Sequence, residues 1–259
     1  MTTVSPPQTE INSVIALYSN GQIQEALDAV ETLIKSYPNE ALLYNISGAC
    51  FAGLGQLDNT LKSYEKALAI KPDYAEAHNN LGNALNDLGQ LDEAVKCFKQ
   101  ALAIKPDYAE AHNNLGNTFK NLGQLDTAVK SYEQVLAINP NFAEAHNNLG
   151  VTLQELGQHD DAVKCFEKAL VIKPDYADAH YNLAVTFQEL GDVLKNLGQL
   201  DAAIKSYELA LTVKPDYAEA FNNLCSTLEE LGQLDTSVKS YKQVLAINPD
   251  FAEAHNNLG

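Results

Sequence analysis

The segment Ala75–Pro106, which reads AEAHNNLGNALNDLGQLDEAVKCFKQALAIKP, decides the fold of this 259-residue chain. Its first half places Leu81, Leu85 and Leu88 at offsets of four and three, which brings them to one face of a helix. Gly89 follows directly, and glycine ends a helix readily because it adopts the left-handed conformation without strain. The pattern therefore predicts one helix before Gly89 and a second helix after it.

The second predicted helix carries an apolar row that includes Val95 and Phe98, and Pro106 ends it because proline lacks the N–H that a helix needs. The small residues Gly82 and Ala94 leave room for the paired helices to approach closely. The segment is therefore expected to form a tight hairpin of two helices.

Side-chain caps are expected at the start of both helices. Asp73 followed by Glu76 has the spacing of a capping box, in which two side chains accept from unpaired backbone N–H groups. Asp92 is the expected N-cap of the second helix.

The same pattern recurs along the chain with a period of 34 residues. Prolines lie 34 residues apart except for one interval of 41, at Pro38, Pro72, Pro106, Pro140, Pro174, Pro215 and Pro249. We call the position of a residue within its unit its place, and we number places from 1 so that Ala75 is at place 1. The units are then 7–40, 41–74, 75–108, 109–142, 143–176, 177–217 and 218–251, followed by a partial unit at 252–259. Residues 1–6 are expected to form a disordered tail. One hairpin cannot bury its apolar face alone, so the units are expected to stack into a solenoid.

Composition excludes several classes of partner. The chain has 17 basic residues, all of them Lys, against 34 acidic residues, which gives a formal net charge of −17. Neither nucleic acid nor a membrane is therefore an expected partner. The N-terminus MTTVSPPQTE has no secretory pattern, and four separated cysteines indicate neither a disulfide framework nor a zinc site. A cytoplasmic location is expected.

A family signature is visible in the unit 109–142. Its places 4, 7, 8, 11, 20, 24 and 32 are occupied by His112, Leu115, Gly116, Phe119, Ala128, Tyr132 and Pro140. This pattern resembles the tetratricopeptide repeat family over about residues 7–259. The last full unit departs from the pattern with Cys225 for Gly and Ser237 for Ala. The resemblance implies an all-α, right-handed superhelical solenoid of antiparallel helix pairs, with a concave binding surface lined chiefly by the first helices.

Asparagines recur on the surface that the resemblance makes concave. Places 5 and 9 lie on one stripe of the first helix, and place 6 adds a second row. Because an amide offers both a donor and an acceptor, such a row suits an extended peptide backbone. The candidate groove residues are Asn79, Asn80, Asn83, Asn113, Asn114, Asn117, Asn147, Asn148, Tyr181, Asn182, Asn222 and Asn223.

These asparagines allow two interpretations. They resemble the asparagine ladder in the repeat region of O-linked N-acetylglucosamine transferases, which holds extended substrate segments. Alternatively, the place-6 asparagines bond to the neighbouring helix and keep the repeats in register.

The unit 177–217 carries seven extra residues within LGDVLKNLGQLD. Seven residues advance a helix by about 700°, which is only about 20° short of two turns, so Leu190 recurs in phase as Leu197. An elongated first helix, about 10 Å longer, is expected, and the alternative is a solvent loop that starts at Gly191. The extension at 187–198 and the uncovered C-terminal end are candidate surfaces for self-association.

No catalytic residue, metal site or cofactor is predicted. The place-4 histidines lie on different units, and packed helices are about 8–10 Å apart, whereas zinc ligands lie within about 2.1 Å of one ion. The expected function is therefore a non-catalytic module that binds an extended peptide or a partner protein. The alternative is the substrate-presenting or oligomerising arm of a glycosyl-, sulfo- or methyltransferase. Its catalytic domain would lie beyond Gly259, because the chain ends within a predicted first helix.

Overall fold

The computed structural model describes residues 5–247, and these residues form 14 helices and no strand. The chain forms two compact units, Met1–Ile138 and Asn139–Gly259. The predicted partial unit at 252–259, the uncovered C-terminal end and most of the predicted tail lie outside the described residues.

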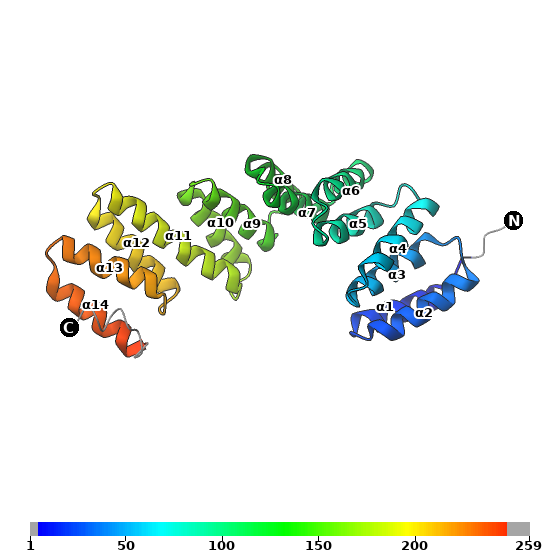
Figure 1. Ribbon diagram of the computed structural model, residues 1–259, viewed down its shortest axis with the longest axis horizontal. Helices are drawn as coiled ribbons and strands as arrows, with labels where there is room; N and C mark the ends of the chain where they lie inside the picture. The colour runs from blue at the N-terminus through cyan, green and yellow to red at the C-terminus, as the bar shows by residue number, and fades with distance from the viewer. Residues whose placement is uncertain (1–4, 248–259) are drawn as a thin grey trace. The chain divides into compact units, whose positions relative to one another are not determined.

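Both compact units are built from helix pairs that follow one another along the chain (Figure 1). The first unit contains α1 (Gln8–Ser19), α2 (Ile23–Ser36), α3 (Ala41–Gly53), α4 (Leu57–Ile70), α5 (Ala75–Asp87), α6 (Leu91–Ile104), α7 (Ala109–Asn121) and α8 (Leu125–Ile138). The second contains α9 (Ala143–Glu155), α10 (His159–Ile172), α11 (Ala177–Asn196), α12 (Leu200–Val213), α13 (Ala218–Glu230) and α14 (Leu234–Ile247). Within each unit a helix packs on its pair partner, and consecutive odd-numbered helices also contact each other. The all-α solenoid of stacked helix pairs predicted from the sequence is thus confirmed.

The turn inside each pair depends on a glycine in the left-handed conformation, as predicted. At Gly89 φ is 73°, and the next residue, Gln90, donates its backbone N–H to the Leu85 carbonyl at 2.9 Å. This bond satisfies a carbonyl that the end of α5 leaves open. The place-15 glycine has the same conformation in all seven units: Gly21, Gly55, Gly89, Gly123, Gly157, Gly198 and Gly232.

Paired helices approach closely where a glycine faces a buried ring. A Cβ added at Gly82 would lie 2.7 Å from the Cε1 atom of Phe98, which is too close for any side chain. Gly116 meets Tyr132 and Gly150 meets Phe166 in the same way. The periodic place-8 glycine therefore fixes how closely the pair packs.

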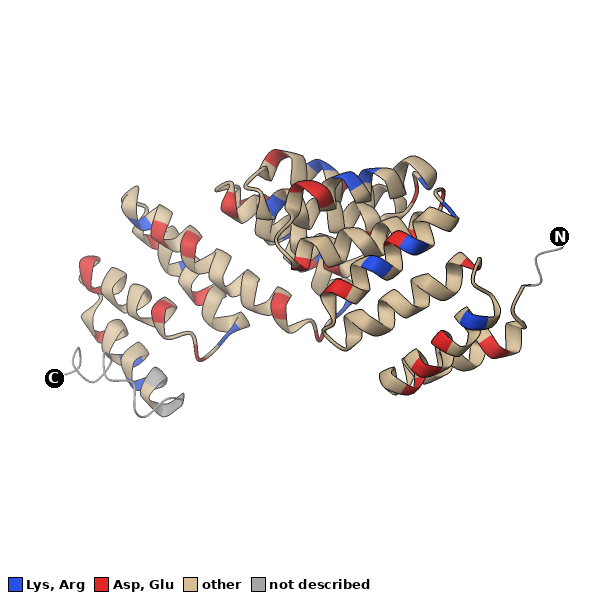
Figure 2. Cartoon of the chain, turned by 45° about the vertical axis from the view of Figure 1, so that its right-hand side comes forward, with Lys and Arg blue, Asp and Glu red and all other residues tan. Residues whose placement is uncertain are grey.

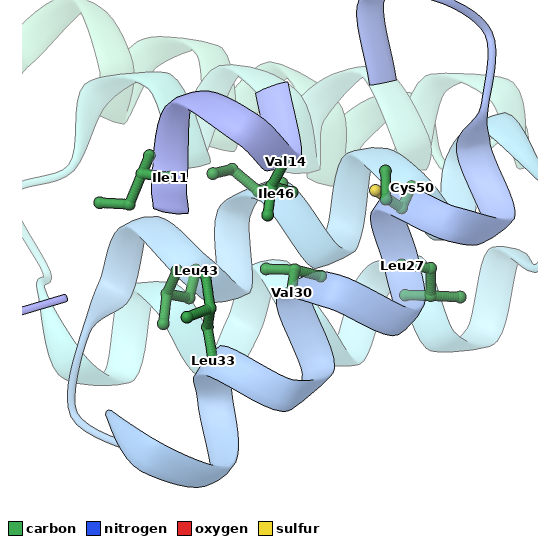
Figure 3. Packing of buried hydrophobic residues seen from close by; sticks show 9 residues of the cluster. Ile11, Val14, Leu27, Val30, Leu33, Leu43, Ile46 and Cys50 are labelled. Atoms are coloured by element: carbon green, nitrogen blue, oxygen red, sulfur yellow. The ribbon is translucent and has the colours of Figure 1, made fainter. Parts of the chain in front are cut away.

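The first three helices share an apolar core (Figure 3). Ile11 and Val14 of α1 belong to one buried cluster with Val30 of α2 and Ile46 of α3, and Val30 is completely buried. No single pair could bury these side chains alone, so the hairpins stabilise one another by stacking. Charged residues are spread along the helices and turns of both units, with acidic ones in excess (Figure 2).

The predicted side-chain caps are wrong. The N-cap residues of α5 and α6 are Tyr74 and Gln90, and neither makes a side-chain cap hydrogen bond. Gln90 is already fixed by the glycine turn, so α6 begins immediately after it and Asp92 lies inside the first turn. Asp92 and Glu76 therefore favour their helices through the helix dipole instead.

The seven extra residues lengthen a helix, and the alternative of a solvent loop at Gly191 is wrong. α11 is one continuous helix of 20 residues, whereas α9 and α13 have 13 each. Gly191 lies buried inside α11 and faces the Tyr207 ring of α12.

Candidate functional site

Three place-6 asparagines donate to the place-5 asparagine of the preceding repeat. In the first compact unit, Asn80 Nδ2 donates to Asn45 Oδ1 and Asn114 Nδ2 to Asn79 Oδ1, both at 3.1 Å. In the second, Asn182 Nδ2 donates to Asn147 Oδ1 at 3.0 Å. Each of these bonds joins the first helices of two consecutive repeats. They match the interpretation in which the place-6 asparagines keep the repeats in register.

Most place-5 asparagines are withdrawn from solvent. The exposed fractions of Asn79, Asn113 and Asn147 are 0%, 2% and 6%. The place-6 residues Asn80, Asn114, Asn148, Asn182 and Asn223 are half-buried, as is Asn222 at place 5. The structure thus divides the predicted amide row into a buried set and a half-buried set, a division that the sequence does not indicate.

The long helix α11 changes the partners of the last candidates. Asn223 Nδ2 donates to Asp192 Oδ1 at 2.9 Å, because Asp192 lies in the extra turns of α11. Tyr181 is 54% exposed, and the Lys214 ammonium lies 5.1 Å from its ring centroid. Tyr181 therefore presents an aromatic surface where most repeats carry an amide.

At place 9 the two asparagines of the first compact unit differ in their bonding. Asn117 Oδ1 accepts a hydrogen bond from the Tyr132 hydroxyl at 2.7 Å. Asn83 stands at the same place one repeat earlier, but its ring partner is Phe98, which has no hydroxyl. Asn83 is half-buried, and its amide makes no hydrogen bond to another residue in the described part of the chain.

A hollow of about 250 Å³ lies beside Asn83. Its walls come from α1, α3, α4 and α5, all in the first compact unit. Its residues include Tyr18, Ala49, Ala52, Tyr64, Asn83 and Asp87. Most of the residues that line it belong to the first helices α1, α3 and α5.

The place-4 histidines have a bonding role that the sequence interpretation missed. Nε2 of His78 lies 2.9 Å from the Pro72 carbonyl oxygen, and His112 makes the equivalent contact with Pro106 at 3.0 Å. Tyr44 donates its hydroxyl to the Pro38 carbonyl at 3.1 Å. The constant separation of six residues between the proline and the place-4 side chain was the available signal.

Burial perturbs one of these histidines. His146 is 6% exposed, and its Nε2 lies 3.0 Å from the Pro140 carbonyl oxygen. Loss of solvation lowers the pKa of His146; the nearby Lys168 acts in the same direction and the Pro140 bond opposes it. The neutral imidazole is therefore favoured in the folded chain.

Neither a metal cluster nor a membrane-spanning helix is found among residues 5–247. No group of three His, Cys, Asp or Glu side chains there could hold an ion. None of the helices in that range combines the length and the hydropathy needed to cross a bilayer.

Comparisons with known proteins identify the repeat. A family model described as TPR repeat matches residues 48–88, 82–123, 116–157 and 226–259, and one described as tetratricopeptide repeat matches 141–216. No curated protein matches the chain.

Several solved structures are similar to the chain. The crystal structure of MamA shares 27% identity, with a TM-score of 0.56 over 62% of this chain and 95% of that one. YrrB, described as a TPR protein with an unusual peptide-binding site, shares 24% identity, with a TM-score of 0.61 over 76% of this chain and 97% of its own. The C-terminal part of a TPR repeat-containing protein from Cytophaga hutchinsonii shares 19% identity, with a TM-score of 0.72 over 96% and 99%. The last two similarities establish the fold alone.

Proposed function

The chain belongs to the tetratricopeptide repeat family, and from that premise we propose that it is a non-catalytic module that binds an extended peptide or a partner protein. The binding surface is the one formed by the first helices. The observation that carries this proposal is the half-buried Asn83 amide, which is uncommitted within the described fold and borders a hollow.

The proposed contacts are those amides and hydroxyls of the first helices that solvent can reach. A net hydrogen bond contributes about 0.5–1.5 kcal/mol. A few such bonds, less the ordering of the peptide, support micromolar affinity at best, or about −8 kcal/mol. The buried Asn79, Asn113 and Asn147 support this surface from behind.

The test compares an amide that borders the hollow with one that lies outside it. Asn83→Ala is expected to weaken the capture of peptides on a random peptide array, and to leave the free energy of unfolding nearly unchanged. Asn59→Ala is the matched control, because it removes an exposed amide from the second helix α4, outside the hollow, and it should leave capture unchanged. Undiminished capture by the Asn83→Ala protein would count against the proposal.

The transferase alternative uses the same surface to present substrates to a catalytic domain. It depends on the resemblance of the asparagine row to that of O-linked N-acetylglucosamine transferases. Reading the coding sequence past codon 259 decides between the two, because a transferase domain there would replace the free-standing module.

A second proposal concerns self-association through the long helix α11. Its extra turns carry two exposed apolar side chains, Val193 at 43% and Leu197 at 67%. Leu88, which precedes its turn glycine as Leu197 does, is only 38% exposed. Burying such a patch against a second copy would remove it from water. Sedimentation is expected to show a dimer that Leu197→Glu converts to a monomer, and a monomeric parent chain would exclude this role.

A further inference from the structure

We propose that the hollow beside Asn83 takes a basic side chain, lysine or arginine, from a bound peptide. This inference rests on the proposed function and adds the class of residue that the peptide must carry. It follows from how the hollow arises, from its walls and from the charges that face it.

The hollow lies where the two members of a tyrosine–asparagine pair, which meet in the unit 109–142, are divided between two neighbouring repeats. In the unit 109–142, the Tyr132 hydroxyl donates to Asn117. The unit 41–74 keeps the tyrosine, Tyr64, but has Ala49 in place of the asparagine. The unit 75–108 keeps the asparagine, Asn83, but has Phe98 in place of the tyrosine. The Tyr64 hydroxyl and the Asn83 amide therefore lack the partner that Tyr132 and Asn117 find in each other, and both residues line the same hollow.

The walls suit an alkyl chain that ends in a polar group. Ala49 and Ala52 are small, and together with Tyr18 and Tyr64 they line a volume of about 250 Å³. Pockets for drug-sized ligands begin at about 300 Å³, so this hollow fits a single long side chain. Lysine and arginine lay their methylene groups along such apolar surfaces while the charged head reaches polar partners.

The polar groups around the hollow favour a cation. Asp87 is exposed and makes neither an ion pair nor a side-chain hydrogen bond with another described residue. Asn80 uses its Nδ2 to bond Asn45, which leaves its carbonyl oxygen as an acceptor. Burial raises the pKa of Tyr64, so its hydroxyl stays neutral and keeps its capacity to accept a hydrogen bond.

No basic residue is among those that line the hollow in the described structure. An acidic side chain would meet Asp87 with the same charge, and a purely apolar one would leave the carboxylate and the amide oxygens unused. The chain's net charge of −17 also attracts basic peptides at long range. A lysine or arginine is therefore the occupant that satisfies all of these groups.

The first arm of the test measures the binding of three labelled peptides that differ only at one central residue, which is Lys, norleucine or Glu. Fluorescence anisotropy is expected to show the Lys peptide binding about tenfold more tightly than the norleucine peptide, with the Glu peptide weakest. Asp87→Asn is expected to reduce the Lys preference to within about twofold. Glu65→Gln removes the same charge from an exposed site on α4 outside the hollow and should keep the preference.

The second variant, Ala49→Asn, gives Tyr64 the partner that Tyr132 has and fills the hollow with a residue that the other repeats accept. It should abolish the Lys preference while the protein stays folded. Equal binding of the Lys and norleucine peptides by the parent chain, or a preference unchanged by Asp87→Asn, would overturn the assignment and leave the peptide-binding function intact.

The second arm uses a probe too small to test the whole surface. N-acetyl-lysine methylamide is expected to shift the amide NMR signals of Ala49, Ala52 and Asn83, and its norleucine analogue is not. The shifts should vanish in Ala49→Asn. Absent shifts would refute the hollow as a basic-residue site. Shifts seen with the small probe when none of the peptides binds would support the site and refute the wider peptide-binding function.

Discussion

Replacing Asn114 by alanine should lower the free energy of unfolding by about 2–3 kcal/mol, although Asn114 itself is only half-buried. The reason lies in its partner. Asn79 is 0% exposed, its Oδ1 accepts from Asn114 at 3.1 Å, and its Nδ2 has no hydrogen-bond partner in the described structure. Asn114→Ala therefore leaves a buried amide with neither end bonded.

The magnitude follows from the asymmetry of buried hydrogen bonds. Losing a bond and stranding a buried acceptor costs about 1–3 kcal/mol, whereas removing both partners together can be nearly neutral. Asn79→Ala should cost about 1 kcal/mol, because water can reach the half-buried Asn114 that remains. The double variant should then be no less stable than Asn114→Ala alone, which additive effects would not allow.

Urea unfolding followed by circular dichroism measures all three variants, and Asn83→Ala is the control because its amide bonds no described residue. We expect a change of less than about 0.5 kcal/mol for Asn83→Ala. Two results would refute the reasoning: an Asn114→Ala protein as stable as Asn83→Ala, or a double variant whose loss equals the sum of the single losses.

Three further changes test other features of the fold. Gly82→Ala should lower the free energy of unfolding by about 1–3 kcal/mol, because its Cβ would lie 2.7 Å from the Phe98 ring. Gly53→Ala is the control: the nearest atom to its Cβ would be 3.3 Å away, so in thermal unfolding it should stay within about 1 kcal/mol of the parent. The parent chain should lose stability as the pH falls from about 7.5 to about 5.5, because the pKa of His146 is lowered in the folded state and the unfolded chain therefore binds more protons there. In His146→Tyr this acid-induced loss of stability should be smaller. An unchanged pH profile would exclude His146 as a cause. Deleting Asp192–Gly198 restores a 34-residue unit but sets Ala184 opposite the Tyr207 ring in place of Gly191, so it should destabilise the chain by about 1–3 kcal/mol. Adding Ala184→Gly should recover that loss in the same melts.

The features that the sequence predicts well are those that a single residue type explains. Only glycine tolerates both the left-handed turn at Gly89 and the ring contact at Gly82, so its period alone locates the turn and the close approach in each pair. The helix starts were predicted less well. Asp92 has the chemistry of a cap, but the hydrogen bond of Gln90 in the glycine turn decides where α6 begins.

The candidate site could be predicted only in part, because asparagine suits two environments equally. Asn79 and Asn80 are adjacent and about 100° apart around the helix, and the packing of α5 on its neighbours decides which of them is buried. A row of asparagines in the sequence therefore predicts hydrogen bonding without saying whether the partner is a ligand or the next repeat. The hollow was missed for a related reason: it depends on pairing Ala49 with Tyr64 and Asn83 with Phe98, and each substitution alone looks harmless.

The long helix α11 shows why an insertion of seven residues fits a stack of repeats. Its N-terminal half acts as a first helix toward the preceding repeat, where Asn182 bonds Asn147. Its C-terminal half repeats the role toward α12, where Gly191 faces the Tyr207 ring and Asp192 Oδ1 accepts from the Tyr207 hydroxyl at 2.6 Å. The two halves can share one helix because seven residues return almost to the same face, about 20° short of two turns. An insertion of five or six residues would rotate the second half by about 100–200° and turn its glycine away from α12, so the length of this insertion is set by the packing on both sides.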